Sequence, residues 1–271
     1  GVVSPDPPQG VWSTEIRTEH NFVRLGLVGS IGGIRKYIAE VSYVNGLTVE
    51  GVLVGDKERF AKEFSEIPFA ADTYEELLEK VDAVYIVSHP SQHYNHILKA
   101  LHKGKHVLCE SPIALNVDQY EELSALAQEK GLVLMDAIKT AYGMAYNRLI
   151  LLLKGGKIGR VVSVDAICTS LQDLQNSDYK NLDKKWNSIC AWGPTALLPI
   201  FQLLGPDYKS KIITSSFIDA ELHFDMFSKI AFIYEHAVAS IKVGKGVKSE
   251  GELIISGTQG YVYVPAPWWK M

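Results

Sequence analysis

The glycine-rich stretch "GLVGSIGGI" at residues 26–34 is the clearest candidate for chemistry in this sequence. It follows a short apolar run, "VRLGLV" at 23–28, and precedes a segment that reads as a helix. Glycines between a strand and a helix let the backbone approach a dinucleotide pyrophosphate, which the helix N-terminus attracts. The candidate phosphate-binding turn consists of Gly29, Ser30, Ile31 and Gly32. A glycine turn that binds no ligand is the alternative, because such a pattern is a weak signal by itself.

Two features of this segment depart from the dinucleotide pattern G-x-G-x-x-G. Counted from Gly29, the middle glycine position holds Ile31, and we expect its β-branched side chain to crowd a pyrophosphate. The acid expected about 20 residues further on, which would bind the ribose hydroxyls, is also missing. That position falls at Val54 and Gly55, and the nearest acid is Asp56. No arginine stands beside it to bind a 2′-phosphate, so the sequence leaves NAD and NADP open.

Three histidines, His89, His93 and His96, lie close together in the sequence. His93 and His96 are three positions apart on an expected helix, a spacing at which both could bind one metal ion. However, no carboxylate or cysteine stands beside them at ligand spacing. We therefore expect no metal site. Cys109, which ends an apolar run, is expected to be an inert core thiol.

Composition and charge limit the class of protein. The chain has 271 residues, enough for one large domain or two ordinary ones. Its net charge of −4 gives no reason to expect a nucleic acid or an anionic membrane as partner. Three scattered cysteines indicate a reducing compartment rather than a disulfide framework. No apolar run approaches the roughly 20 residues of a membrane span, and no leader is recognisable, so we expect a cytoplasmic protein.

Strand-like and helix-like segments alternate over residues 23–144. The expected strands cover 23–28, 47–54, 82–88, 106–110 and 132–137. The expected helices cover 34–44, 57–64, 73–80, 93–104 and 117–131. Thr73 followed by Glu76 predicts a capping box at the start of the third helix. This alternation predicts βαβ units and a doubly wound parallel sheet of the Rossmann type.

The pattern changes after residue 144. A helix at 145–156 leads to a strand at 160–170, a polar loop at 171–188 and a helix at 191–205. Strand-like runs follow at 211–222, 228–236, 238–244, 251–257 and 260–265. Successive strands with short turns predict a mostly antiparallel open sheet in an α+β domain. The expected organisation is an extension or linker at 1–22, a Rossmann domain at 23–144, and a substrate or oligomerisation domain at 145–271.

Four segments together resemble the Gfo/Idh/MocA family of NAD(P)-dependent oxidoreductases. They are "RLGLVGSIGGI" (24–34), "DAVYIVSHPSQHYNHILKALHKGKHVLCESP" (82–112), "LLLKGGKIGRVVSVDA" (151–166) and "WGPTALLPIFQLLG" (192–205). The second is the most specific, and the resemblance runs from about residue 23 to about residue 265. It implies a Rossmann domain followed by a domain with a large open sheet. It also implies oxidation or reduction of a hydroxyl or carbonyl group on sugar-like substrates.

The resemblance assigns the nucleotide site to matching positions of this chain. Gly29 to Gly32 would form the phosphate turn, with Gly55 at the end of the second strand. The loop after the third strand would contribute Ser88, His89, Pro90 and His93, and Glu110 would lie beside the nicotinamide ribose. NAD or NADP is the implied cofactor.

The proton-transfer positions of the family are occupied by other residues here. Ser111 stands where the family has the lysine of Glu-Lys-Pro. In the helix after the polar loop, Ala191 and Thr195 stand where the family usually has an aspartate and a histidine, and Leu198 replaces a further acid. Serine and threonine hydroxyls have no pKa near neutrality and cannot replace a lysine or histidine as acid or base.

Several residues could replace the missing group. Lys139, with Tyr142 nearby, follows the last strand of the first domain and would point toward the same end of the cleft. Lys184 or Lys185 on the polar loop could also reach it. A solvated surface lysine is the alternative interpretation of Lys139. Trp186 and Trp192 would flank a substrate cleft, where an indole can stack on a sugar ring, although packing at the domain boundary is the favoured interpretation.

Three functions follow from these observations. The first is an NAD(P)-dependent oxidoreductase for a sugar-like or sugar-nucleotide substrate, with weak or non-standard catalysis. The second is a catalytically silent relative that binds a nucleotide or sugar as a sensor or partner-binding module. The third and less favoured is a scaffold with neither activity nor cofactor, in which Ile31 fills the phosphate site. An open apolar sheet face predicts a homo-oligomer, most simply a dimer. The sequence stops at "PAPWWKM", earlier than the family pattern. We therefore expect a natural short form, a shortened expression product or one part of a longer polypeptide.

Overall fold

The computed structural model describes residues 22–41, 46–171, 187–218, 221 and 224–271. Residues 1–21 of the expected linker at 1–22 lie outside the described residues, as do Lys184, Lys185 and Trp186. The chain forms two compact units, Gly1–Asp136 and Ala137–Met271. The division therefore falls at Asp136, ahead of the boundary expected after residue 144.

The first unit contains the expected doubly wound parallel sheet. Its strands are β1 (Val23–Gly29), β2 (Leu47–Leu53), β3 (Ala83–Val87), β4 (His106–Cys109) and β5 (Leu134–Asp136). They lie in the order β2-β1-β3-β4-β5, and every neighbouring pair is parallel. Because all five strands run the same way, their carboxyl ends meet at one edge of the sheet, where ligands bind in folds of this kind.

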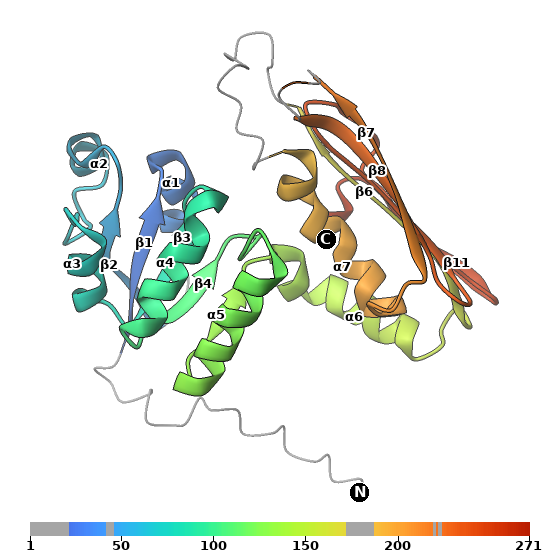
Figure 1. Cartoon of the computed structure of the whole chain (residues 1–271), viewed down its shortest axis with the longest axis horizontal. Coiled ribbons are helices and arrows are strands. Elements are labelled where there is room, and N and C mark those ends of the chain that lie inside the picture. Colours follow the sequence, from blue (N-terminus) through green and yellow to red (C-terminus); the bar gives the residue numbers. More distant parts are fainter. Residues whose placement is uncertain (1–21, 42–45, 172–186, 219–220, 222–223) are drawn as a thin grey trace, which may run out of the picture. The chain divides into compact units, whose positions relative to one another are not determined.

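Helices α1 (Ile31–Val41), α2 (Lys57–Glu63), α3 (Tyr74–Lys80), α4 (Pro90–His102) and α5 (Val117–Lys130) connect these strands (Figure 1). Two begin earlier than the sequence predicted, because polar side chains cap them. The Ser30 hydroxyl accepts a hydrogen bond from the Gly33 N–H at 3.2 Å, so α1 begins at Ile31. The His89 imidazole likewise caps α4, which begins at Pro90.

The capping motif predicted at Thr73 is present in part. The Thr73 hydroxyl accepts from the Glu76 N–H at 3.2 Å, as a capping box requires. The Glu76 carboxylate, however, accepts from the N–H of Asp72 at 3.2 Å rather than from that of Thr73. The helix start is fixed in either case, because backbone donors on both sides of Thr73 find side-chain acceptors.

The turn between β1 and α1 depends on a glycine that closely approaches the neighbouring strand. Gly29 is paired with Val87 of β3 and has φ of 157°. A Cβ atom added at Gly29 would lie 2.7 Å from the carbonyl oxygen and from a methyl carbon of Val87. Any side chain at this position would push β1 and β3 apart, so only glycine fits.

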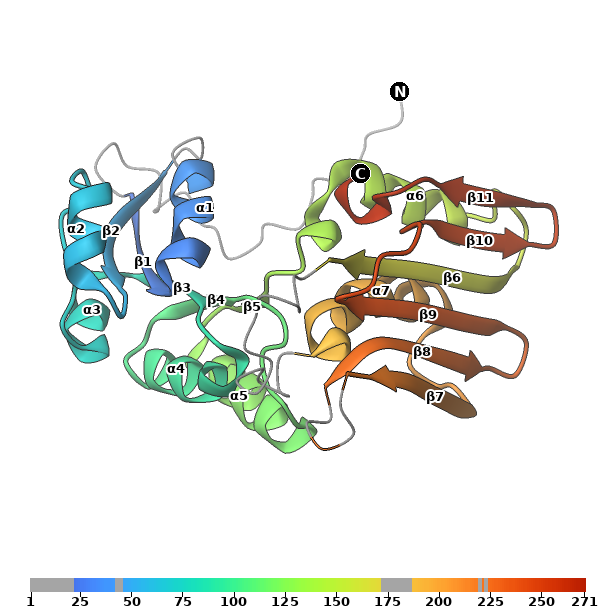
Figure 2. The same cartoon turned by 90° about the horizontal axis from the view of Figure 1, so that it is seen from above.

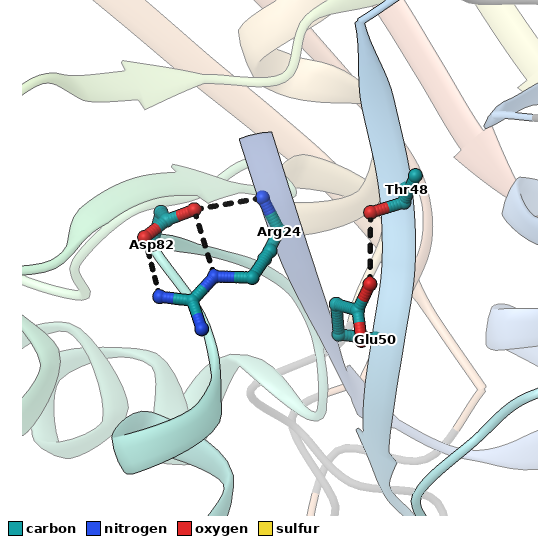
Figure 3. A network of polar contacts seen from close by, with 4 residues as sticks. All are labelled: Arg24, Thr48, Glu50 and Asp82. Carbon is teal, nitrogen blue, oxygen red and sulfur yellow. Dashed lines mark hydrogen bonds and ion pairs between the residues drawn. The ribbon is translucent and has the colours of Figure 1, made fainter. Parts of the chain in front are cut away.

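An ion pair ties β1 to the chain just before β3 (Figure 3). The Arg24 guanidinium donates to the Asp82 carboxylate at 2.9 and 3.2 Å, and the Arg24 N–H donates to the same carboxylate at 2.9 Å. Arg24 holds the pKa of Asp82 below its usual value. Both side chains are well exposed, so this pair is worth only about 0–1 kcal/mol and mainly fixes strand position.

The second unit is built on a sheet of six strands. They are β6 (Val161–Ser170), β7 (Ser210–Phe217), β8 (Asp225–Ile233), β9 (Val238–Lys245), β10 (Leu253–Gly257) and β11 (Gly260–Val264). Figure 2 shows their order, β11-β10-β6-β9-β8-β7. All neighbouring pairs are antiparallel except β6 and β9, which are parallel. The prediction of a mostly antiparallel sheet is therefore confirmed.

Helices α6 (Met144–Lys154) and α7 (Ser188–Leu204) cover one face of this sheet (Figure 2). Their buried side chains form a core with the inward residues of β6, β9 and β10. Trp268, in the 3₁₀ helix η5 (Trp268–Lys270), is fully buried in this core, and its indole N–H donates to the Ile167 carbonyl at 2.9 Å. Within the described residues, no helix is long and apolar enough to cross a membrane.

A polar cluster fixes the first turn of α7 against the sheet. The Asn187 side chain caps the helix, and the Asp225 carboxylate accepts from the Ser188 N–H at 3.1 Å. The Ser188 hydroxyl accepts from the Lys245 N–H at 2.8 Å. The Lys245 side chain lies on the α7 face of β9, because it alternates in step with the buried Ala239, Ile241 and Val243. Burial lowers its pKa to about 8.

The close approach at Gly29 gives a first prediction. Gly29→Ala should destabilise the first unit by about 2–4 kcal/mol, because the new methyl group meets the Val87 backbone in an unfavourable conformation. The matched control is Gly32→Ala, whose methyl group would meet nothing within 4 Å. Urea unfolding of both variants checks this, and equal midpoints would show that the β1–β3 contact tolerates a side chain.

Lys245 gives a second prediction. Its pKa is lowered from 10.5 to about 8, so between these values the unfolded chain holds a proton that the folded chain has lost. Stability should therefore rise with pH across this window, through the contribution of Lys245. The free energy of unfolding of Lys245→Met should exceed that of wild type most below pH 8, and this difference should shrink toward pH 10.5. Urea unfolding at four pH values measures it, and Lys242→Met, on the other face of β9, is the control. A gain that does not depend on pH would contradict the argument.

Candidate functional site

A pocket of about 510 Å³ lies where β1, β2 and β3 end at the carboxyl edge of the parallel sheet. Its lining consists of Val28, Gly29, Ser30, Leu53, Val54, Gly55, Ser88, His89, Gln92 and His96. The predicted residues Gly29, Ser30, Gly55, Ser88 and His89 are thus brought together from three loops. Leu53, Gln92 and His96 are additional wall residues that the sequence did not single out for this site.

The phosphate side of the pocket is formed by the turn from β1 into α1. Gly29 brings the backbone close to β3, and the Ser30 hydroxyl caps α1. The first N–H groups of α1 and its dipole favour an anion at this end of the helix. None of the pocket-lining residues is acidic. This part of the site therefore suits the pyrophosphate of a dinucleotide.

Ile31 does not obstruct this turn. It is the first residue of α1, its side chain is buried, and it does not belong to the pocket lining. The expectation that Ile31 would crowd a pyrophosphate is therefore wrong, because the side chain packs into the protein as α1 begins. Gly32 follows it on the exposed side of the first turn.

The ribose side of the pocket lacks the expected carboxylate. Gly55 lines the pocket, whereas Asp56 caps α2 by accepting from the Arg59 N–H at 3.0 Å. Arg59 in turn donates to Glu63 at 3.0 Å. The acid closest in sequence thus serves the helix rather than the pocket, which leaves this wall free of negative charge.

The third wall comes from the end of β3 and the first turns of α4. The Ser88 hydroxyl lies 3.0 Å from Nδ1 of His96, and His89 Nδ1 lies 2.7 Å from the Ser91 hydroxyl. Burial lowers the pKa of His96 to about 4, so this ring is neutral at neutral pH. The Tyr74 hydroxyl donates to the His96 carbonyl at 2.7 Å and fixes the helix turn that carries it. A neutral imidazole and a serine hydroxyl can exchange hydrogen bonds with a ribose or an adenine.

His93 supports the site from below rather than lining it. It is fully buried, with Nε2 2.7 Å from the Ser88 carbonyl and Nδ1 2.6 Å from the Pro112 carbonyl. It thereby lies between the loop after β3 and the turn after β4; burial lowers its pKa, and the neutral ring has one N–H to donate to one of these two carbonyls. Pro90 is buried at the first position of α4, and Glu110 is half-buried directly after β4. Neither belongs to the pocket lining.

Ser111 makes a defined contact at the position of the family lysine. Its hydroxyl donates to Oδ2 of Asp136, the last residue of β5, at 3.2 Å. Burial raises the pKa of Asp136 to about 6, and the hydrogen bond from Ser111 opposes this shift. Sequence reasoning missed Asp136, although its place at the end of an expected strand was a usable signal.

The second unit has its own pocket of about 320 Å³ at the end of β6. It is lined by Thr169, Ser170, Leu171, Trp192, Lys248, Trp269 and Lys270. The Trp192 and Trp269 rings lie 5.0 Å apart, and the Trp192 indole N–H donates to the Ser170 hydroxyl at 2.9 Å. Trp192 therefore combines packing within the second unit with an exposed edge toward a pocket.

The remaining predicted positions also lie in the second unit. Ala191 and Thr195 are half-buried on α7, with Leu198 one turn further along. Lys139 and Tyr142 are the first and last residues of the 3₁₀ helix η2 (Lys139–Tyr142); the Lys139 side chain is exposed. Among the described residues, no group of three or more His, Cys, Asp or Glu side chains is arranged to hold a metal ion.

Comparison with known proteins gives a specific match for the first unit. Residues 23–137 match the GFO_IDH_MocA family, described as an oxidoreductase family with an NAD-binding Rossmann fold. The chain is 31% identical over 125 residues to scyllo-inositol 2-dehydrogenase (NADP(+)) IolU of Bacillus subtilis, covering 44% of this chain and 38% of that protein. It is 38% identical over 104 residues to mouse trans-1,2-dihydrobenzene-1,2-diol dehydrogenase, covering 38% of this chain and 31% of that protein. The matched parts thus span about a third of these relatives.

The two-unit architecture also occurs in solved structures. Scyllo-inositol dehydrogenase from Lactobacillus casei, crystallised with NAD(H) and scyllo-inositol, superposes with a TM-score of 0.78 at 19% identity. The alignment covers 90% of this chain and 76% of that one, so both units share the fold of that protein. Through residues 23–137, the chain is similar to the Gfo/Idh/MocA family of oxidoreductases.

Proposed function

We propose that this protein is an NAD(P)-dependent oxidoreductase acting on a hydroxyl or carbonyl group of a sugar-like substrate. The observation that carries the proposal is the pocket at the ends of β1, β2 and β3, which joins a helix N-terminus to walls without acidic side chains. A dinucleotide brings two phosphates and two riboses, and these walls offer backbone donors, hydroxyls and neutral imidazole to them.

Each wall has a separate task in this proposal. The backbone at Gly29 and Ser30 binds the pyrophosphate, and the Leu53–Gly55 segment contacts the adenosine ribose. Ser88 and His89 position the remainder of the nucleotide, with His93 holding their loop in place. Four further predicted residues stay candidates for contacts with the nucleotide, through their backbone or at the margin of the pocket: Ile31, Gly32, Pro90 and Glu110. The bound nicotinamide supplies hydride transfer, and this chain supplies binding, orientation and proton movement.

The pocket of the second unit supports a sugar-like substrate. The Trp192 and Trp269 rings form an aromatic wall on which a sugar or cyclitol ring can stack. Lys248 and Lys270 supply hydrogen-bond donors at its rim. The relatives named above act on a cyclitol and on a cyclic diol. A first substrate panel is therefore scyllo-inositol, myo-inositol and trans-1,2-dihydrobenzene-1,2-diol. The buried thiols Cys109 and Cys168 fit a reducing compartment such as the cytoplasm.

A silent binding protein is the second candidate, and it is favoured by the residues at the family's proton-transfer positions. Ser111, Ala191 and Thr195 provide no group that titrates near neutrality. A sensor that binds the nucleotide without turnover would keep the same pocket. The two functions are separated by turnover of the substrate panel once nucleotide binding has been measured.

The uncharged ribose wall gives a prediction about the cofactor. Wild type should bind NADPH at least as tightly as NADH, because no pocket-lining carboxylate repels the 2′-phosphate. In Gly55→Asp the preference should move toward NADH by about tenfold, since the new carboxylate repels the phosphate and accepts from ribose hydroxyls. Gly55→Asn keeps the shape without the charge and is the matched control. A Cβ atom at Gly55 meets nothing within 4 Å, so both variants should fold.

Calorimetric titration of both reduced cofactors measures these preferences. Micromolar binding of either cofactor to wild type supports the proposal. Absence of binding of both at millimolar concentration would refute the oxidoreductase proposal. If Gly55→Asp and Gly55→Asn change the preference between NADH and NADPH equally, Gly55 does not belong to the wall that contacts the ribose.

We also propose that the uncovered sheet face forms a homodimer. The described helices of the second unit lie on one face, while exposed large side chains alternate to the other: Ile212, Ile233, Val238, Tyr261 and Tyr263. Polar side chains such as Asp165, Ser240 and Lys242 lie between them, and exposed apolar side chains rimmed by polar ones often mark an interface. Sedimentation at micromolar concentration should give a dimer, and Val238→Glu should weaken it. Leu151→Glu, at an exposed position of α6, is the control. A wild-type monomer would contradict the proposal.

A further inference from the structure

We infer that Ser111 and Asp136 form a proton relay, in which Ser111 contacts the reacting hydroxyl of the substrate and Asp136 takes up its proton. The inference rests on the oxidoreductase function proposed above. It identifies a proton carrier within the first unit at the place where the family lysine has been replaced. Lys139 and Thr195, the carriers suggested by the sequence, are the competing candidates.

The parallel sheet brings the two residues of the relay to the same edge. β4 and β5 are neighbours, with Cys109 paired to Asp136. Asp136 ends β5 and Ser111 follows β4, so both lie at the carboxyl edge of the sheet. The nucleotide pocket occupies the same edge at β1, β2 and β3. A hydroxyl-to-carboxylate hydrogen bond of 3.2 Å joins the pair. Ligands of doubly wound sheets bind along this edge.

His93 connects the relay to the nucleotide pocket. Its two ring nitrogens lie 2.7 Å from the Ser88 carbonyl and 2.6 Å from the Pro112 carbonyl. Ser88 lines the pocket, and Pro112 follows Ser111 in the chain. One fully buried side chain therefore sets the distance between the nucleotide-binding loop and the turn that carries Ser111.

The surroundings of Asp136 suit a group that gains and loses a proton. Burial raises its pKa to about 6, close to the pH at which a proton carrier works best. Titratable groups close to this region include the Cys109 thiol and the Glu110 carboxylate, on β4 and the turn after it. The Cys109 pKa is raised by burial and by Asp136, so the thiol stays neutral and does not compete.

Protons and electrons are balanced when the relay takes part in the oxidation of an alcohol. The substrate O–H proton moves to the Ser111 oxygen as the Ser111 hydroxyl proton moves to Oδ2 of Asp136. The C–H hydrogen leaves as hydride to an oxidised nicotinamide, which is reduced. The products are a carbonyl compound, a reduced nicotinamide and a protonated Asp136. In the reverse direction, protonated Asp136 returns the proton through Ser111 to the forming alkoxide.

The competing candidates are less suited to this task. Thr195 offers only a hydroxyl, which does not titrate near neutrality. Lys139 has an exposed side chain on η2. Ser111 already occupies the lysine position of the family motif and contacts a group that titrates near pH 6.

The first test uses binding and does not depend on turnover. If Asp136 lies near the nicotinamide, the positive charge of the oxidised ring should lower its pKa and release protons at pH 6. Calorimetric titration in buffers of different ionisation enthalpy measures the number of protons released on binding NADP⁺ and on binding NADPH. If the protein binds NAD⁺ and NADH instead, that pair is compared in the same way. The 2′-phosphate titrates in both forms and cancels in the difference. Wild type should release more protons with the oxidised form, and Asp136→Asn should abolish this difference.

Ser111→Ala tests the hydrogen bond itself. Loss of this donor should raise the Asp136 pKa further, so proton release should reach its maximum at a higher pH. Asp118→Asn, which removes an exposed carboxylate at the start of α5, is the matched control and should behave as wild type. Where a panel alcohol is oxidised, kcat/KM should rise with pH through about pH 6 in wild type. The Ser111→Ala variant should lose about 10²–10⁴-fold.

The outcomes separate the relay from the proposed function. Absence of nucleotide binding by wild type would refute the oxidoreductase function and the relay with it. If wild type binds the nucleotide but releases the same number of protons with the oxidised and the reduced form, the relay alone is overturned. The relay is also overturned if wild type shows a difference and Asp136→Asn shows the same difference. The relay would also be overturned if Lys139→Ala abolished the pH dependence of kcat/KM and Ser111→Ala left it unchanged. A proton difference that Asp136→Asn removes and Asp118→Asn retains would establish Asp136 as the proton carrier.

Discussion

The proposed nucleotide pocket depends on one backbone contact, the close approach of Gly29 to Val87. Because a side chain cannot fit between these strands, β1 ends next to β3 and the chain turns directly into α1. Ser30 then caps the helix, and Ile31 packs inward as its first residue. The start of this helix consequently lies beside the pocket formed by the ends of β1, β2 and β3. The wider walls of the site follow from this single constraint and from the parallel order of the strands.

The other half of the same sheet edge is organised by buried polar groups. His93 holds the loops after β3 and β4 at a fixed separation through two backbone carbonyls. The Ser111–Asp136 pair lies at the end of this arrangement. Such groups are costly to bury unless they are hydrogen-bonded, so their presence at the ligand-binding edge points to a functional use. In the proposed mechanism, structural and chemical roles are thus divided between a histidine beneath the pocket and a carboxyl group further along the same edge of the sheet.

The substitutions at Ser111, Ala191 and Thr195 acquire a different meaning in this context. Taken from the sequence alone, they indicate that an oxidoreductase scaffold has lost its proton-transfer residues. In the fold, Ser111 is joined to a carboxyl group whose pKa lies near 6, at the edge where the nucleotide pocket lies. The family relationship of residues 23–137 and the shared fold of the second unit define the scaffold. The chemistry has to be argued from the residues that this chain actually carries.

The sequence by itself determined the alternation of strands and helices, the change to a mostly antiparallel sheet, and the loops that contribute Gly29, Ser30, Gly55, Ser88 and His89. These features follow from local periodicity and from turn residues, which act over a few positions. Tertiary structure decided that Ile31 points inward, that His93 is a buried support, and that Asp136 meets Ser111 across 25 residues. Such pairings depend on strand order and burial, which bring distant residues together and change their pKa values. A linear pattern contains neither distance nor burial, so the proposed proton relay could be inferred only from the folded chain.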